Sequence, residues 1–142
     1  GMLRAAMLEA DGRPIPGVGT GDFEPLKGDA TRALARWKGG AVPIDRAGRV
    51  VHPGDVLRQL DRALGNVDAL LRSGSATLDD MMNFTVYLRD PTDFGRIDSY
   101  LSERFPRLPI LIVQGAVCRP EWLVEVEGVA VVANDLPALP PF

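Results

Sequence analysis

The chain of 142 residues has very little cysteine and histidine, with Cys118 and His52 the single residues of each kind. One cysteine excludes an internal disulfide, and one cysteine with one histidine cannot supply the four ligands of a standard zinc site. We therefore expect no metal centre of this kind and no cofactor, while carboxylate sites for harder ions remain open.

The sequence also lacks a dense block of lysine or arginine, and its formal net charge is −3 with a pI near 5.1. Nucleic acids and anionic membranes select clustered positive charge, so neither is an expected partner. No apolar run reaches the roughly 18 residues of a membrane-spanning helix, and no charged segment followed by an apolar one resembles a signal peptide. We expect a cytoplasmic protein.

What the chain does contain, 46% hydrophobic and 25% charged residues, is typical of one globular domain with a real core. We expect a single domain over residues 2–142, with its core at about 33–133. The segment 10–30 is so rich in glycine and proline that we expect an excursion without regular secondary structure. The proline-rich tail 134–142 is expected to run extended over the surface.

Two segments carry the apolar spacing of amphipathic helices. In the first, leucine and valine recur at steps of three and four residues; Gly54 or Asp55 can begin this helix and Gly74 can end it. The second covers residues 92–105 and has aromatic and aliphatic residues on one side. Both helices are therefore expected to bury one face.

Strands are expected where β-branched and aromatic residues cluster, in the segments 31–40, 41–52, 81–90, 108–117 and 122–132. The order of elements predicts an α+β fold in which two helices pack on one face of a mixed sheet. The stretch LPILIVQG is apolar at consecutive positions, so both of its faces require burial, although two helices can cover only one face of the sheet. We infer a homo-oligomer.

The last predicted strand, WLVEVEGVAVV, carries two acids inside an apolar run, Glu125 and Glu127. Side chains alternate between the faces of a strand, so both acids lie on the face opposite Val124 and Val126. They mark a polar face of the sheet, where one carboxylate is enough to do chemistry and the other can be a solvated acid.

The strings GGAVPIDRAGRVV, DVLRQLDRALGNVDALLRSGSATLDDMMNFTVYLRDPTDFGRIDSYLSERFP and LVEVEGVAV resemble the Rid family, also called YjgF-like or L-PSP proteins. Older labels for its members are endoribonuclease and translation initiation inhibitor. The resemblance covers the chain from about Trp37 to Val132. It implies a chorismate-mutase-like fold and a homotrimer with clefts between subunits.

In the deaminase branch of that family, an enamine or imine is hydrolysed to a keto acid and ammonia. An arginine on the penultimate strand holds the substrate carboxylate, and the first glutamate of the last strand orients or activates water. Carried over, that glutamate is Glu125. The stretch with Gly39 and Gly40 corresponds to backbone that contacts the substrate in relatives.

The arginine departs from the family pattern, in which Pro-Ala-Arg precedes the penultimate strand. When the family pattern is aligned from Glu125, Ile110 occupies the position of the family's arginine. When it is aligned from Phe105, Arg107 falls one residue before that position. A slip of one residue turns a side chain to the other face. Ordinary imine deaminase activity is therefore disfavoured, and an apolar cleft that includes Phe84 and Ile110 would indicate a binding module.

The stretch VCRPEWLVEVEGV also resembles the C-terminal half of chorismatases, in which Arg119 beside a final-strand glutamate would pair with an anionic ring acid. The leading interpretation is a Rid-like protein that binds a small carboxylate-bearing metabolite at subunit interfaces. If the protein is an enzyme, we expect it to hydrolyse an enamine or an imine, or to act on a chorismate-like acid. The alternative is a non-catalytic metabolite-binding or regulatory module, and the acidic charge balance argues against ribonuclease activity.

Overall fold

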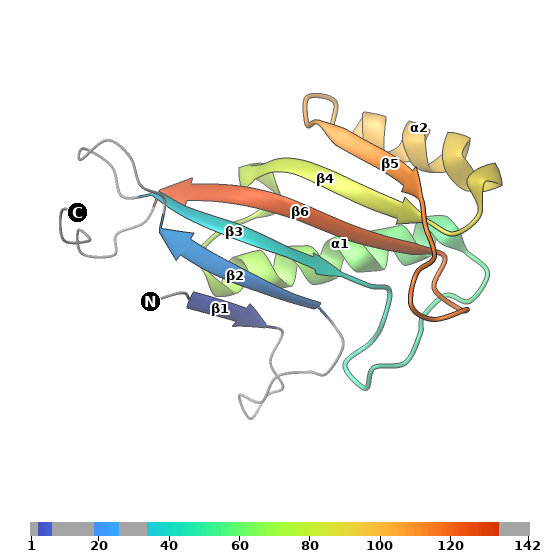
Figure 1. Ribbon diagram of the computed structural model, residues 1–142, viewed down its shortest axis with the longest axis horizontal. Helices are drawn as coiled ribbons and strands as arrows, with labels where there is room; N and C mark the ends of the chain where they lie inside the picture. The colour runs from blue at the N-terminus through green and yellow to red at the C-terminus, as the bar shows by residue number, and fades with distance from the viewer. Residues whose placement is uncertain (1–2, 7–18, 26–33, 134–142) are drawn as a thin grey trace.

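The structure, a computed structural model, describes residues 3–6, 19–25 and 34–133, with side chains described from residue 37 to residue 132. Within these residues six strands form one sheet in the order β1-β2-β3-β6-β4-β5 (Figure 1). Strands β4 and β5 run parallel, and the other neighbours are antiparallel. Their bounds are β1 Leu3–Ala6, β2 Gly19–Pro25, β3 Leu34–Ala41, β4 Met81–Leu88, β5 Ile110–Gln114 and β6 Val124–Ala133.

Two helices, α1 (Val56–Ser73) and α2 (Phe94–Arg104), lie on the same side of the sheet (Figure 1). The Asp55 side chain caps α1 by accepting a hydrogen bond from the Arg58 backbone N–H at 3.1 Å. Short 3₁₀ turns, η1 (Leu78–Asp80) and η2 (Pro91–Asp93), precede β4 and α2. The α+β architecture with two helices on one sheet face is therefore as the sequence predicts.

The core lies between the helices and the inward face of the sheet. Every second residue of β6 is buried there, as are the inward residues of β4, while α1 contributes most of its apolar stripe. The large, fully buried members of this core are Trp37, Phe84, Leu60, Leu64, Leu70, Leu71, Leu88, Ile97 and Leu101.

A second, smaller core joins the loop after β3 to the loop before β6. It consists of Val42, Ile44, Val117 and Trp122, with Val50 and Tyr87 packed against it. The side chain of Arg89 holds the second of these loops by donating to the carbonyl oxygens of Val117, Arg119 and Trp122 at 2.6–2.8 Å. Tyr87 belongs to β4, so these two loops border one end of the sheet.

One segment differs from the expectation. Residues 19–25 were expected to lack regular secondary structure but form β2, because their backbone groups pair with both β1 and β3 and this pairing outweighs the low strand propensity of glycine. Residues 10–18, 26–30 and 134–142, for which an excursion and an extended tail are expected, lie outside the described residues. The short strands expected within 41–52 reduce to a single bridge between Ile44 and Val50.

Over the described part of the chain, no helix combines the length and the apolar character that crossing a membrane requires. The same residues contain no group of three or more histidine, cysteine, aspartate or glutamate side chains placed to hold a metal ion.

Candidate functional site

The candidate site lies on the face of the sheet that the two helices leave uncovered. Strand β6 sends Val124 and Val126 into the core, so Glu125 and Glu127 point to the other face, as their spacing predicts. We call this surface the open face. Its described members, identified by alternation and register, are Lys38, Gly40, Asn83, Thr85, Tyr87, Leu111, Val113, Glu125, Glu127, Val129 and Val131.

Strand register brings polar side chains from β4 beside the two glutamates. Tyr87 is paired with Glu125, while Thr85 is paired with Glu127. On the other side of β6, Gly40 of β3 is paired with Glu127. The acids therefore sit at the centre of a four-strand surface, with a hydroxyl on each neighbouring position of β4.

A hollow of about 440 Å³ opens on this face. Three glycines form part of its wall, and at Gly40 an added Cβ would lie only 2.7 Å from the carbonyl oxygen of Val126. A side chain cannot be accommodated at residue 40 without a shift, because atoms of β6 already occupy the space that a Cβ would fill. Lys38 supplies the positive charge of this hollow. The lining residues are Lys38, Gly39, Gly40, Asn83, Thr85, Glu127, Gly128 and Val129.

The two glutamates differ in their surroundings. The Tyr87 hydroxyl donates a hydrogen bond to Glu127 Oε2 at 3.0 Å. Glu125 is half-buried, and this burial together with the neighbouring charge of Glu127 raises its pKa above the ordinary value. The hydrogen bond and charge of Glu127 in turn raise the pKa of Tyr87. Glu125 thus keeps its proton to higher pH than an ordinary glutamate, which suits an acid–base residue.

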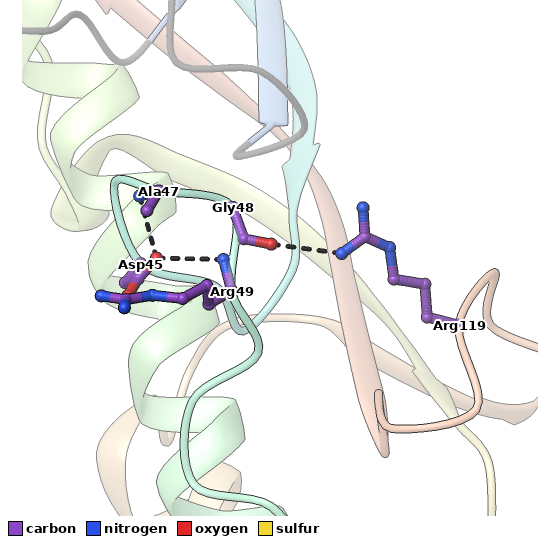
Figure 2. A network of polar contacts seen from close by, with 5 residues as sticks. All are labelled: Asp45, Ala47, Gly48, Arg49 and Arg119. Carbon is purple, nitrogen blue, oxygen red and sulfur yellow. Dashed lines mark hydrogen bonds and ion pairs between the residues drawn. The ribbon is translucent and has the colours of Figure 1, made fainter.

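Neither of the two arginines considered from the sequence lies beside Glu125. Arg107 is exposed in the turn before β5, and that strand begins at Ile110, three residues or roughly 10 Å from the level of Glu125. Arg119 lies in the loop before β6, where its guanidinium donates to the Gly48 carbonyl oxygen at 3.1 Å (Figure 2).

Arg119 also stacks over the ring of Trp122, with 5.1 Å from the guanidinium carbon to the ring centroid. Its side chain therefore joins the loop before β6 to the loop at residues 45–49 (Figure 2). This placement assigns Arg119 a structural contact within the described residues.

Phe84 and Ile110 belong to the helix-covered side of the sheet. Phe84 is buried and packs edge-on against Phe105, with ring centroids 5.5 Å apart, and Ile110 is its register partner on β5. Both therefore form the core beneath the candidate site. Gly39 pairs with Gly128 and, with Gly40, lines the hollow.

Sequence reasoning missed Lys38, Thr85 and Tyr87. Period-two alternation along β4 could have grouped Thr85 with Tyr87, because both are only partly buried between fully buried neighbours. Their position beside the glutamates depends on the pairing of β4 with β6, about 40 residues apart, which no local pattern encodes.

Comparison with known proteins identifies the family. The family model described as endoribonuclease L-PSP matches residues 37–132. A RutC family protein of Pyrococcus abyssi is 33% identical over 93 residues, which are 64% of this chain and 73% of the relative. The 3-aminoacrylate deaminase RutC of Acinetobacter baylyi is 32% identical over 93 residues, 64% of this chain and 74% of the relative.

Among solved structures, TdcF of E. coli, determined with bound serine, superposes with a TM-score of 0.59 at 24% identity, covering 76% of this chain and 85% of TdcF. This likeness shows the fold. Together with the match of the family model, it supports one conclusion: the chain belongs to the endoribonuclease L-PSP family, which is the Rid or YjgF-like family that the sequence resembles.

Proposed function

We propose that the open face, completed by further copies of the chain, binds a small carboxylate-bearing metabolite and hydrolyses its enamine or imine group with Glu125 as the acid–base residue. The observation that carries the proposal is the half-buried Glu125 with a raised pKa, beside a Glu127 that Tyr87 holds by a hydrogen bond. The relative from Acinetobacter baylyi is described as a 3-aminoacrylate deaminase, a hydrolase of this chemical class.

The arrangement suggests a role for each group. Lys38 can attract the substrate carboxylate to the hollow from its place opposite Val129, four residues along β6 from Glu125, and the absence of a side chain at Gly40 leaves room in the hollow beside it. Glu125 can accept a proton from the water that attacks the imine carbon and return it to the departing nitrogen, so that an imine and water become a carbonyl group and ammonia. No net proton is consumed at the carboxyl group.

The decisive experiment measures ammonia release above the spontaneous rate from freshly generated 2-aminoacrylate and 3-aminoacrylate, with chorismate as a separate arm. We expect turnover of an aminoacrylate that falls by about 10² or more in Glu125→Gln, in the range that general acid–base groups supply. The matched control is Glu121→Gln, because Glu121 is an exposed acid in the loop before β6. Equal rates in the two variants would refute the role of Glu125.

A second candidate function, binding without catalysis, is favoured by the positions of Arg107 and Arg119, neither of which is at the level of Glu125. Titration calorimetry with pyruvate separates the two. Binding that weakens in Lys38→Gln, with no turnover of either aminoacrylate, would establish a metabolite-binding module. Absence of both binding and turnover would contradict both functions.

We further propose that the open face is the interface of a homotrimer. Leu111 is 58% exposed there, and the aliphatic Val113 and Val129 share the surface. Sedimentation equilibrium should give three times the chain mass of 15.3 kDa. Leu111→Glu should dissociate the assembly, whereas Phe94→Glu, a control at an exposed apolar residue that begins α2, should leave it intact.

A further inference from the structure

We infer that a groove on the helix side of the molecule is a docking site for an extended acidic peptide segment of a partner protein. The groove runs between α1 and the loop at residues 44–50, and we call it the arginine groove. It consists of two hollows, of about 320 and 570 Å³, which meet at Arg62 and Gly65. Its charged and flanking members are Arg46, Arg49, Arg58, Arg62, His52, Asp45 and Asp61.

The acids of the groove are already engaged. Asp45 accepts hydrogen bonds from the backbone N–H groups of Ala47 and Arg49 and pairs with the Arg49 guanidinium at 2.9 Å (Figure 2). Asp61 accepts from the Tyr100 hydroxyl at 2.9 Å and from Arg104 at 2.7 Å. Neither carboxylate is therefore free to neutralise the other cations of the groove.

Three arginines remain. Arg46, Arg58 and Arg62 are exposed and form no ion pair with any described residue. They give this groove a positive charge on a chain whose net charge is −3. The guanidinium group forms paired hydrogen bonds with carboxylates, so the complementary surface is one that presents several carboxylates in a row.

Gly65 provides an independent observation. It is the tenth residue of α1, is exposed, and an added Cβ would meet no atom within 4 Å. Glycine inside a helix is unfavourable relative to alanine, and packing among the described residues does not require it. Its effect is to leave helix backbone bare where the two hollows meet, so that the main chain of a partner can lie directly against α1.

The shape and polarity of the groove favour a peptide over other anions. Small-molecule sites are enclosed and mostly apolar, whereas both of these hollows are open to solvent. The smaller hollow is lined mainly by polar and charged side chains, and the larger one mixes charged residues with apolar ones, as the backbone and side chains of a peptide require. A nucleic acid would require more clustered cations than three arginines on an acidic chain. The α1 wall of the groove lies on the helix side of the sheet, whereas Glu125 points to the open face, so a peptide along α1 does not cover Glu125.

The test is fluorescence anisotropy of a labelled hexaglutamate peptide with the full chain at low salt. We expect saturable binding that weakens about tenfold or more in Arg62→Glu, because an attractive contact becomes repulsive. The matched control is Arg96→Glu on α2, an exposed arginine outside the groove with the same change of charge. Equal losses in both variants, or no saturable binding by the unaltered protein, would overturn the proposal.

Gly65→Gln provides a second variant that does not depend on charge. Glutamine fills the space above α1 and favours the helix, so the thermal midpoint should rise while affinity for hexaglutamate falls several-fold. Unchanged affinity in this variant would contradict contact at Gly65. Inorganic triphosphate and a thymidine oligonucleotide serve as competitors of the labelled peptide. If either displaces it at a lower concentration than unlabelled hexaglutamate does, the groove binds that class of anion and the proposal of an acidic peptide is wrong.

Discussion

Replacement of Gln59 by leucine should destabilise the protein more than any other single polar change on α1. Gln59 is fully buried, and its side-chain amide donates to the carbonyl oxygens of Glu121 at 3.0 Å and His52 at 3.3 Å. Its Oε1 accepts from the backbone N–H of Leu123 at 2.8 Å. This one side chain therefore ties α1 to the loop that leads into β6 and Glu125.

The magnitude follows from the groups that lose a partner. Leucine has a similar volume but no polar atom, so the backbone N–H of Leu123 loses the partner to which it donates and two carbonyl oxygens lose a donor. A buried donor without a partner costs about 1–3 kcal/mol, and two weakened acceptors bring the loss in free energy of unfolding to about 3 kcal/mol. With a slope of about 2 kcal/mol per molar urea, the midpoint should fall by about 1.5 M.

Urea unfolding followed by Trp fluorescence, at a fixed protein concentration, measures this shift. Gln114→Leu is the control, because Gln114 is an exposed glutamine at the end of β5 and should change stability by no more than about 0.5 kcal/mol. A Gln59→Leu midpoint within error of the Gln114→Leu midpoint would show that the hydrogen bonds to the loop do not stabilise the fold.

Three further predictions concern backbone fit and pH. Gly128→Ala should lower the free energy of unfolding, measured in urea, by at least about 2 kcal/mol, because the added Cβ would lie 2.6 Å from the Asn83 carbonyl oxygen and 2.9 Å from the Phe84 ring. An unchanged free energy of unfolding would contradict the close packing of β4 on β6. Gly65→Ala should instead raise stability by about 0.5–1 kcal/mol, measured in the same way, and a loss would reveal a contact that the free Cβ space does not predict. Burial raises the pKa of Glu125 in the folded state, so stability should fall as pH rises from the ordinary value of 4.5 through the raised one. We expect the urea unfolding midpoint, measured between about pH 4 and 8, to show this fall in the unaltered protein and not in Glu125→Gln. An identical pH profile in the variant would exclude Glu125 as the source of the fall.

Much of the fold and part of the site follow from local pattern. The two segments with helical spacing of apolar residues form α1 and α2. They could be predicted because the spacing of apolar residues along the sequence decides which face of a helix is buried. The same reasoning at period two places Glu125 and Glu127 together on one face of β6.

The environment of those acids required the tertiary structure. Tyr87 donates a hydrogen bond to Glu127 because of the register of β4 against β6. Lys38 shares the hollow with Glu127 because of the register of β3 against β6. Register between strands separated by about 40 to 90 residues is set by the packing of the whole sheet, and a shift of one residue would exchange the two faces. The sequence therefore determined which residues are acids on one strand face, while only the assembled sheet decided which cation and which hydroxyl lie beside them.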